Sequence, residues 1–199
     1  EPYYYSVDLD DYGISVQYAP SRQSGIYEIN YNPSDPSAYI IMNTRDGELS
    51  YNNNSISGYQ KLDNNTRVYI YMETDVQPLE TGTHKGDIID VATKSTQGNN
   101  AYFIVRFPNK TKQVNVRYGV SFISADQAQK NLRREIKDYD LAKVAANGRD
   151  IWNSTLGKIQ VSGTDETAKV VFYTSLYRTY ERMICISEDG QYFSAYDHK

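Results

Sequence analysis

The sequence contains few of the residues that build disulfide frameworks, metal centres and catalytic triads. Its 199 residues include 1 Cys and 2 His. Cys185 cannot form an internal disulfide, and its neighbours Ile184 and Ile186 favour a small buried thiol over a reactive one. The histidines, His84 and His198, lie far apart in the sequence, so a histidine-rich zinc site or a Ser-His-Asp triad has little to draw on.

Long apolar runs and an excess of one charge are also missing. No stretch approaches the roughly 18 apolar residues of a membrane span, and no charged-then-apolar leader opens the chain. With Lys+Arg at 21 and Asp+Glu at 25, the formal net charge is -4, and the basic residues are scattered. Nucleic acid and anionic membrane surfaces are therefore not expected partners. Phosphate loops of the GxGxxG or GxxxxGK[ST] type do not occur either.

Tyrosine is the residue that the chain has in abundance. There are 20 Tyr against 5 Phe and 1 Trp. A tyrosine ring packs while its hydroxyl stays in water, which suits half-buried strands and sugar-facing or protein-facing patches. Taken alone, this composition indicates sheet architecture more often than a binding site.

The first part of the chain, from Tyr3 to about Phe122, has the two-residue alternation of β-strands. Short alternating runs are separated by stretches rich in Gly, Asn, Asp and Pro, so we predict eight antiparallel strands in two packed sheets. The segments NPSDPS, YNNNSISG and DNNTR are predicted to be turns or loops. The eight runs are YYYSVDL, GISVQYA, GIYEINY, AYIIMNT, RVYIYMET, DIIDVAT, AYFIVRF and QVNVRYGVSF.

After Phe122 the apolar period becomes that of helices. Ser124 to Gln127 form a capping-box pattern, in which Ser124 caps a backbone amide and Gln127 reaches back to the cap residue. Asp140 is predicted to cap a second helix, and Gly157 to end it. The apolar residues at helical spacing are Ala125, Ala128, Leu132 and Ile136 in the first helix, and Leu141, Val144, Ala145, Ile151 and Trp152 in the second.

A third helix is predicted near the end of the chain. The sequence KIQV at 158–161 predicts a short strand, and Gly163-Thr164-Asp165 then opens a helix over 165–183. Its aromatic and apolar stripe is predicted to pack in a core rather than to bind a ligand. The stripe consists of Val170, Tyr173, Tyr177 and Tyr180.

One segment begins like a calcium loop. Asp8-Leu9-Asp10-Asp11-Tyr12-Gly13 has acids at positions 1 and 3 and Gly at position 6. Position 5 is Tyr12, and position 12 is Ala19 where the loop requires Glu. We therefore predict a hairpin turn here.

Carboxylates are the one kind of catalytic group present in number. Paired carboxylates suit glycoside hydrolysis, but spacing alone nominates no pair, and most surface acids are simply solvated. Four acids near the aromatic C-terminal segment are the first candidates, although solvation is the simpler interpretation of each: Glu181, Glu188, Asp189 and Asp197.

Several short motifs follow one another in a fixed order. Near the front, YYYSVDLDDYGISVQY precedes Arg22 and the turn Ser24-Gly25-Ile26-Tyr27. Later motifs are GVSFIS at 119–124, AQKNLRRE at 128–135, WNSTLGKIQV at 152–161, FYTSLYRT at 172–179, and DGQY at 189–192 followed by Tyr196-Asp197. This order resembles glycoside hydrolase family 92, the calcium-dependent exo-α-mannosidases.

The resemblance implies a mainly β fold with C-terminal helices. Part of an N-terminal antiparallel β-sandwich would occupy 1–122, a helical linker 123–157, and the beginning of a truncated (α/α) barrel domain 158–199. In the family, the parent enzyme removes terminal α-linked mannose with inversion, and calcium helps to bind and distort the sugar. The catalytic carboxylates are expected outside this chain, so no catalytic, substrate-binding or metal residue is assigned within it.

The same resemblance implies partners and a location. Mannose-containing glycans are expected to bind through the parent enzyme, and the remainder of the catalytic domain is the expected protein partner. The fragment alone is expected to be inactive and to bind no calcium. An extracytoplasmic location in a bacterium, whether periplasmic, surface or secreted, follows from the resemblance alone.

Two other classes of function stay open at the level of sequence. A free-standing carbohydrate-binding β-sandwich would explain the strands and the tyrosines. A protein-interaction module would use the C-terminal helices to dock on a partner. The helical tail is needlessly elaborate for either module taken as complete, whereas the family resemblance accounts for it.

Overall fold

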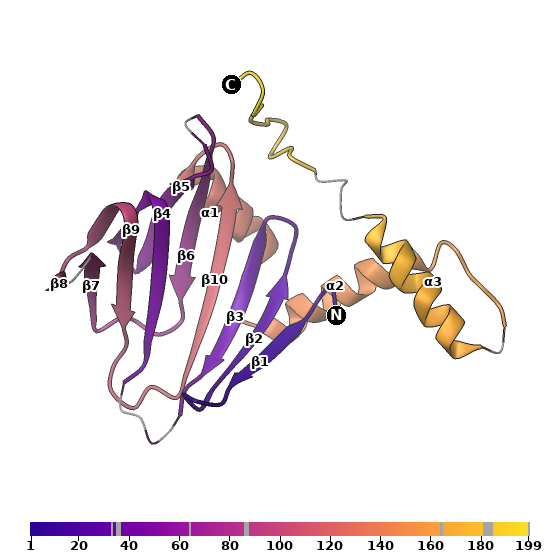
Figure 1. Ribbon diagram of the computed structural model, residues 1–199, viewed down its shortest axis with the longest axis horizontal. Helices are drawn as coiled ribbons and strands as arrows, with labels where there is room; N and C mark the ends of the chain where they lie inside the picture. The colour runs from indigo at the N-terminus through magenta and orange to yellow at the C-terminus, as the bar shows by residue number, and fades with distance from the viewer. Residues whose placement is uncertain are drawn as a thin grey trace.

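The computed structural model describes residues 1–32, 34, 37–63, 65–85, 88–163, 165–180 and 185–198. In this part, ten strands form one antiparallel sheet that is followed by three helices (Figure 1). The order in the sheet is β1-β2-β3-β10-β6-β5-β4-β9-β7-β8. The strands are β1 (Tyr5–Leu9), β2 (Ile14–Pro20), β3 (Ser24–Asn30), β4 (Tyr39–Asn52), β5 (Ser55–Lys61), β6 (Arg67–Thr74), β7 (Glu80–Lys85), β8 (Ile88–Val91), β9 (Ser95–Arg106) and β10 (Gln113–Ser121).

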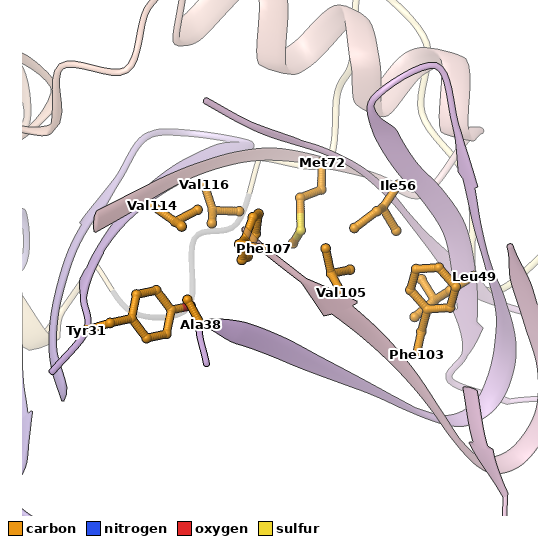
Figure 2. Packing of buried hydrophobic residues seen from close by; sticks show 10 residues of the cluster. All are labelled: Tyr31, Ala38, Leu49, Ile56, Met72, Phe103, Val105, Phe107, Val114 and Val116. Carbon is orange, nitrogen blue, oxygen red and sulfur yellow. The ribbon is translucent and has the colours of Figure 1, made fainter. Parts of the chain in front are cut away.

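A buried apolar core lies between two halves of this sheet. Figure 2 shows side chains from β10, β6 and β5 meeting those of β4 and β9 across the interior. Alternate residues of β9 and β10, such as Phe103 and Val105 or Val114 and Val116, point into this core, as the pleat requires. The mainly β fold with C-terminal helices is thus confirmed, but the described strands belong to one hydrogen-bonded sheet instead of two. The core consists of Tyr31, Ala38, Leu49, Ile56, Met72, Phe103, Val105, Phe107, Val114 and Val116.

The sheet has two strands, β5 and β7, where the sequence predicted none. The segment YNNNSISG contains a turn at Asn53-Asn54, as predicted, but its last four residues begin β5. Asn53 and Asn54 have φ angles of 48° and 61°, which is the left-handed pair that a two-residue hairpin turn needs. The sequence of β7, ETGTHK, lacks an apolar alternation and so gave no strand signal.

The segment that begins like a calcium loop is a hairpin turn, as predicted. Leu9 pairs with Ile14 across β1 and β2, and the Tyr12 amide donates to the Leu9 carbonyl over 2.9 Å. Gly13 has a φ of +59°, which an L side chain rarely adopts.

Two helices, α1 (Ala125–Glu135) and α2 (Leu141–Leu156), cover the outer face of one half of the sheet (Figure 1). The predicted caps are confirmed, since Ser124 accepts from the Gln127 amide and Asp140 from the Lys143 amide. Gly157 follows the last helical residue, also as predicted. The second core lies beneath these helices and consists of Ala19, Ile26, Leu132, Ile136, Leu141 and Val144.

A glycine lets α1 approach the sheet closely. A Cβ placed on Gly119 of β10 would lie 2.1 Å from the Ala128 carbonyl oxygen. The glycine of the GVSFIS motif therefore sets the separation between β10 and α1.

A buried ion pair between β10 and β6 also contacts α1. Arg117 Nη2 lies 2.8 Å from Glu73 Oε2, and both side chains are nearly buried. Arg117 Nη1 donates to the Ile136 carbonyl over 3.1 Å, and the guanidinium lies 4.6 Å from the centre of the Tyr139 ring. Glu73 also pairs with Arg133 of α1. Both buried charges thus have ion-pair and hydrogen-bond partners, which burial requires.

The third helix, α3 (Glu166–Arg178), projects away from the sheet and lies beside α2 (Figure 1). Asp165 caps it by accepting from the Ala168 amide over 3.1 Å. Trp152 of α2 meets the rings of Tyr177 and Tyr180 edge-on, at centroid distances of 4.8 and 6.0 Å.

Several predictions about this C-terminal region are wrong. None of the α3 residues, all of which are described, is buried within this chain, and Val170 is 63% exposed, so packing of the stripe in a core stays a prediction about residues outside this chain. Ile151 is exposed as well, because α2 leaves the sheet before it ends. Residues 158–161 form no strand; the Ile159 carbonyl instead accepts from the Tyr173 hydroxyl. The predicted helical residues 181–183 lie outside the described residues.

Candidate functional site: the junction of sheet and C-terminal segment

The DGQY motif forms a tight turn. Glu188 and Gln191 exchange two backbone hydrogen bonds of 2.7 and 3.0 Å, which makes them an isolated β-bridge. Between them, Asp189 and Gly190 have φ angles of 51° and 81°. Asp-Gly is a preferred pair for such a turn, because Gly has no Cβ and Asp tolerates the left-handed region. The turn fixes the directions of the side chains before and within it.

Glu188, directly before the turn, points into the protein. It is 2% exposed, and its two carboxylate oxygens accept from the Phe122 amide over 3.0 Å and from Asn131 Nδ2 over 2.8 Å. Asn131 is fully buried and also donates to the Val120 carbonyl. Glu188 therefore ties the C-terminal segment to the end of β10 and to α1.

Asp189 makes a second attachment to α1. Its carboxylate accepts from Gln127 Nε2 over 2.7 Å and forms an ion pair with Arg134. Gln127 Nε2 also donates to Asn131 Oδ1 over 3.1 Å, so its side chain does not reach back to the cap residue, contrary to the predicted capping box. Asp189, the partner that directs the Gln127 side chain away from Ser124, is distant in the sequence.

The turn between β2 and β3 holds the C-terminal segment from the other side. Arg22 Nη2 donates to Cys185 Sγ over 2.7 Å and to the Ser187 carbonyl over 3.3 Å. Cys185 is exposed and not buried as predicted, because it lies on this surface contact. A hydrogen bond from the Ser187 backbone, with the nearby Arg22 charge, lowers the pKa of the Cys185 thiol.

The same turn is bonded to α1. The Gln23 amide donates to Glu135 Oε2 over 2.9 Å, and Arg134 Nη2 donates to Gln23 Oε1 over 3.0 Å. Four of the motifs recognised in the sequence thus meet at one place, which we call the junction: Arg22 to Gly25, Gly119 to Ser124, Ala128 to Glu135, and Asp189 to Tyr192. The sequence identified each motif but gave no sign that they converge.

Beside the junction lies a shallow recess with a volume of about 550 Å³. It is lined by Ile123, Gly190, Gln191, Tyr192 and Phe193, and Tyr192 is 62% exposed. The recess presents aromatic and amide groups but no carboxylate in its lining.

The other candidate residues from the sequence do not join the junction. Glu181 lies outside the described residues, and Asp197 is an exposed acid bonded to the Ser194 hydroxyl. The His84 ring lies 5.7 Å from that of Tyr102 on β9. His198 lies near Asp63, where its charge adds slightly to the lowering of the Asp63 pKa by backbone hydrogen bonds.

The described residues also offer no acid cluster for a metal ion. Among them, no three or more side chains of His, Cys, Asp or Glu converge on one point. Calcium takes about six to eight oxygen ligands, several of them carboxylates. The acids described at the junction serve instead as anchors for the C-terminal segment.

The described fold is a curved antiparallel sheet joined through α1 and α2 to a third helix, α3. Residues 1–121 match the glycosyl hydrolase family 92 N-terminal domain, and residues 127–199 match the glycosyl hydrolase family 92 catalytic domain. The chain belongs to this family, as the sequence motifs indicated.

Solved structures share the fold over nearly the whole chain. The inverting mannosidase of family GH92 from Bacteroides thetaiotaomicron VPI-5482 is 24% identical, with a TM-score of 0.89; the match covers 100% of this chain and 29% of that one. A family GH92 alpha-mannosidase from the same species is 23% identical, with a TM-score of 0.86, over 96% of this chain and 28% of that one.

A curated relative matches a shorter stretch. An uncharacterized secreted glycosidase from the fungus Arthroderma benhamiae is 33% identical over 75 residues, which are 36% of this chain and 10% of the relative. The match thus covers only about a tenth of that protein. Among the described residues, no helix is both long and apolar enough to cross a membrane.

Proposed function

We propose that this chain is a non-catalytic portion of a glycoside hydrolase that removes terminal α-linked mannose from glycans with inversion. Membership of family 92 supports a glycosidase, and a neighbour of the same fold is described as an inverting mannosidase. The chain corresponds to 29% of that neighbour, which leaves most of the enzyme to other residues.

The observation that carries the proposal is the way the junction uses its acids. Glu188 accepts two N–H donors in a buried position, and Asp189 is paired with Gln127 and Arg134. In an inverting glycosidase, one carboxyl protonates the leaving oxygen and another activates water, with roughly 6.5–9.5 Å between them. Because Glu188 and Asp189 hold the C-terminal segment, we propose that they serve neither role. The chain would then act as a scaffold for catalytic groups elsewhere in the enzyme.

The scaffold positions one domain on the other. The junction fixes the start of the family catalytic domain on the β-sheet domain, and pockets often form where two domains meet. Precise placement matters because a displacement of about 1 Å in a reacting group costs large factors in rate.

Calcium is proposed for the complete enzyme and not for this part. When bound, the ion would supply positive charge to sugar oxygens and use binding energy to distort the ring. Its ligands are proposed to lie in other residues, because the described ones offer no converging acids. An extracytoplasmic location is also proposed, supported by the secreted glycosidase among the relatives.

The proposal is tested by assaying the complete protein and the 199-residue chain with an α-mannobiose in calcium buffer. The complete protein is expected to release mannose, to stop on addition of a chelator, and to recover with calcium. The chain alone is expected to release none. Release by the chain would overturn its non-catalytic role, and no release by the complete protein would overturn the activity.

A further inference from the structure

A second recess lies at the end of the sheet away from the junction. Figure 1 shows the β1–β2 turn and the end of β3 at one end, and the passage from β10 to α1 at the other. The recess has a volume of about 560 Å³, within the range of small-molecule sites. Residues of the β1–β2 turn and of the start of β4 line it together.

Two tyrosines of this recess are left in water. Tyr12, from the turn, is 67% exposed, and Tyr39, from β4, is 50% exposed. Ile41, next along the same face of β4, is 52% exposed. Single exposed apolar residues are normal on a protein surface, but several grouped around one recess are typical of a binding surface.

Polar acceptors stand beside these rings. Asp10, Asp11 and Asn32 line the same recess. Carboxylates accept strong hydrogen bonds from hydroxyl groups and repel anionic ligands such as phosphates. The recess therefore combines flat apolar faces with acceptors for neutral hydroxyls.

The recess is formed in advance of any ligand. The Tyr31 hydroxyl, from the buried core, donates to the Tyr39 carbonyl over 3.2 Å. Asn32 closes a local turn by accepting from the Ser34 amide over 2.9 Å. A Cβ on Gly13 would lie 2.7 Å from Asn32 Nδ2, so the β1–β2 turn packs directly on this residue. A fixed geometry lowers the entropic cost of binding.

We propose that this recess is a non-catalytic binding site for neutral hexopyranose units of a glycan. A pyranose ring has an apolar C–H face, which suits the exposed rings of Tyr12 and Tyr39, and hydroxyl groups at its edge, which suit Asp10, Asp11 and Asn32. The site would hold a glycan chain at a distance from the junction. It does not depend on the proposed hydrolytic activity.

The test is affinity electrophoresis of the complete protein in native gels that contain yeast mannan, dextran or galactan. At least one polymer is expected to retard the protein. Tyr12→Ala and Tyr39→Ala should each weaken this retardation roughly tenfold, as loss of one aromatic contact predicts. Tyr5→Ala is the matched control, since Tyr5 is 60% exposed on β1 and does not line the recess.

A second readout separates this site from the catalytic one. Turnover of a small aryl α-mannoside should be unchanged in both recess variants, because the proposed site is not catalytic. Retardation by none of the polymers, or equal retardation of all variants, would overturn the proposal. A melting temperature lowered more by Tyr12→Ala than by Tyr5→Ala, without any loss of binding, would identify a packing surface and also overturn it.

Discussion

Glu188 illustrates how one residue can hold two parts of this protein together. Its carboxylate oxygens accept from Phe122 and Asn131, at the end of the sheet and on α1. In the variant Glu188→Gln, one oxygen becomes an NH₂ group that faces a donor. Leaving a buried donor unsatisfied costs about 1–3 kcal/mol.

The expected result of Glu188→Gln is therefore local release of the C-terminal segment at 185–198. Hydrogen exchange at the Phe122 amide and limited proteolysis should both become faster. Asp197→Asn is the control, since Asp197 is exposed, and should change neither rate. Unchanged exchange in Glu188→Gln would show that the buried carboxylate does not hold the segment.

Asp63 gives a prediction about pH. Backbone amides of Asn65 and Thr66 donate to its carboxylate and lower its pKa below the usual value. Its stabilising effect is complete above the unfolded pKa of about 3.9 and is lost as pH falls through the lower folded pKa. Asp63→Asn keeps an acceptor but does not titrate. Urea midpoints should thus fall more steeply with acid in the natural protein than in the variant, and equal slopes would contradict this.

Single residues were predictable where their partners are close in sequence. Ser124 and Asp140 bond to amides three residues ahead, so their roles as caps could be predicted. Gln127 and Cys185 have decisive partners at Asp189 and Arg22, which are distant along the chain. Because the prediction for each of these residues rested on its neighbours in the sequence, it assigned both to the wrong environment.

At the scale of elements, the ion pair of Arg117 on β10 and Glu73 on β6 joins neighbouring strands, and its contacts with Ile136 and Arg133 hold α1 on the sheet. In the variant Arg117→Met, the nearly buried Glu73 carboxylate keeps Arg133 but loses the partner beside it in the sheet, which costs about 3 kcal/mol. The free energy of unfolding in urea should fall by that amount.

The matched control for this prediction is Arg106→Met. Arg106 pairs with Glu80 at 2.8 Å, but both side chains are 42% exposed. Exposed pairs contribute about 1 kcal/mol or less. If the two variants lost equal stability, the buried pair would contribute no more than an exposed one.

Strands and helices were predictable where a repeating apolar pattern marks them. Eight strands alternate clearly and were found, whereas β7 is too polar and β5 was hidden by its Asn-rich turn. The stripe on α3 has helical spacing, yet none of its residues is buried. A period predicts which face is apolar, but not whether another element in the same chain covers it.

At the scale of the whole molecule, the β-sheet domain and the start of the family catalytic domain are joined at the junction. The family could be predicted from motif order, because each motif has a local structural role. Gly119 permits a close helix approach, Asp189-Gly190 forms a tight turn, and Arg22 lies at a hairpin end. The meeting point of the motifs could not be predicted, because sequence order says nothing of the distances between them.

The most direct test of the proposed activity is a proton NMR time course of the complete protein acting on an α-mannobiose, read at the anomeric proton of the first mannose released. We predict β-mannose first, with α-mannose appearing only by later mutarotation, because water attacks the face opposite the leaving group. Initial release of α-mannose, or no release of mannose at all, would contradict an inverting mannosidase.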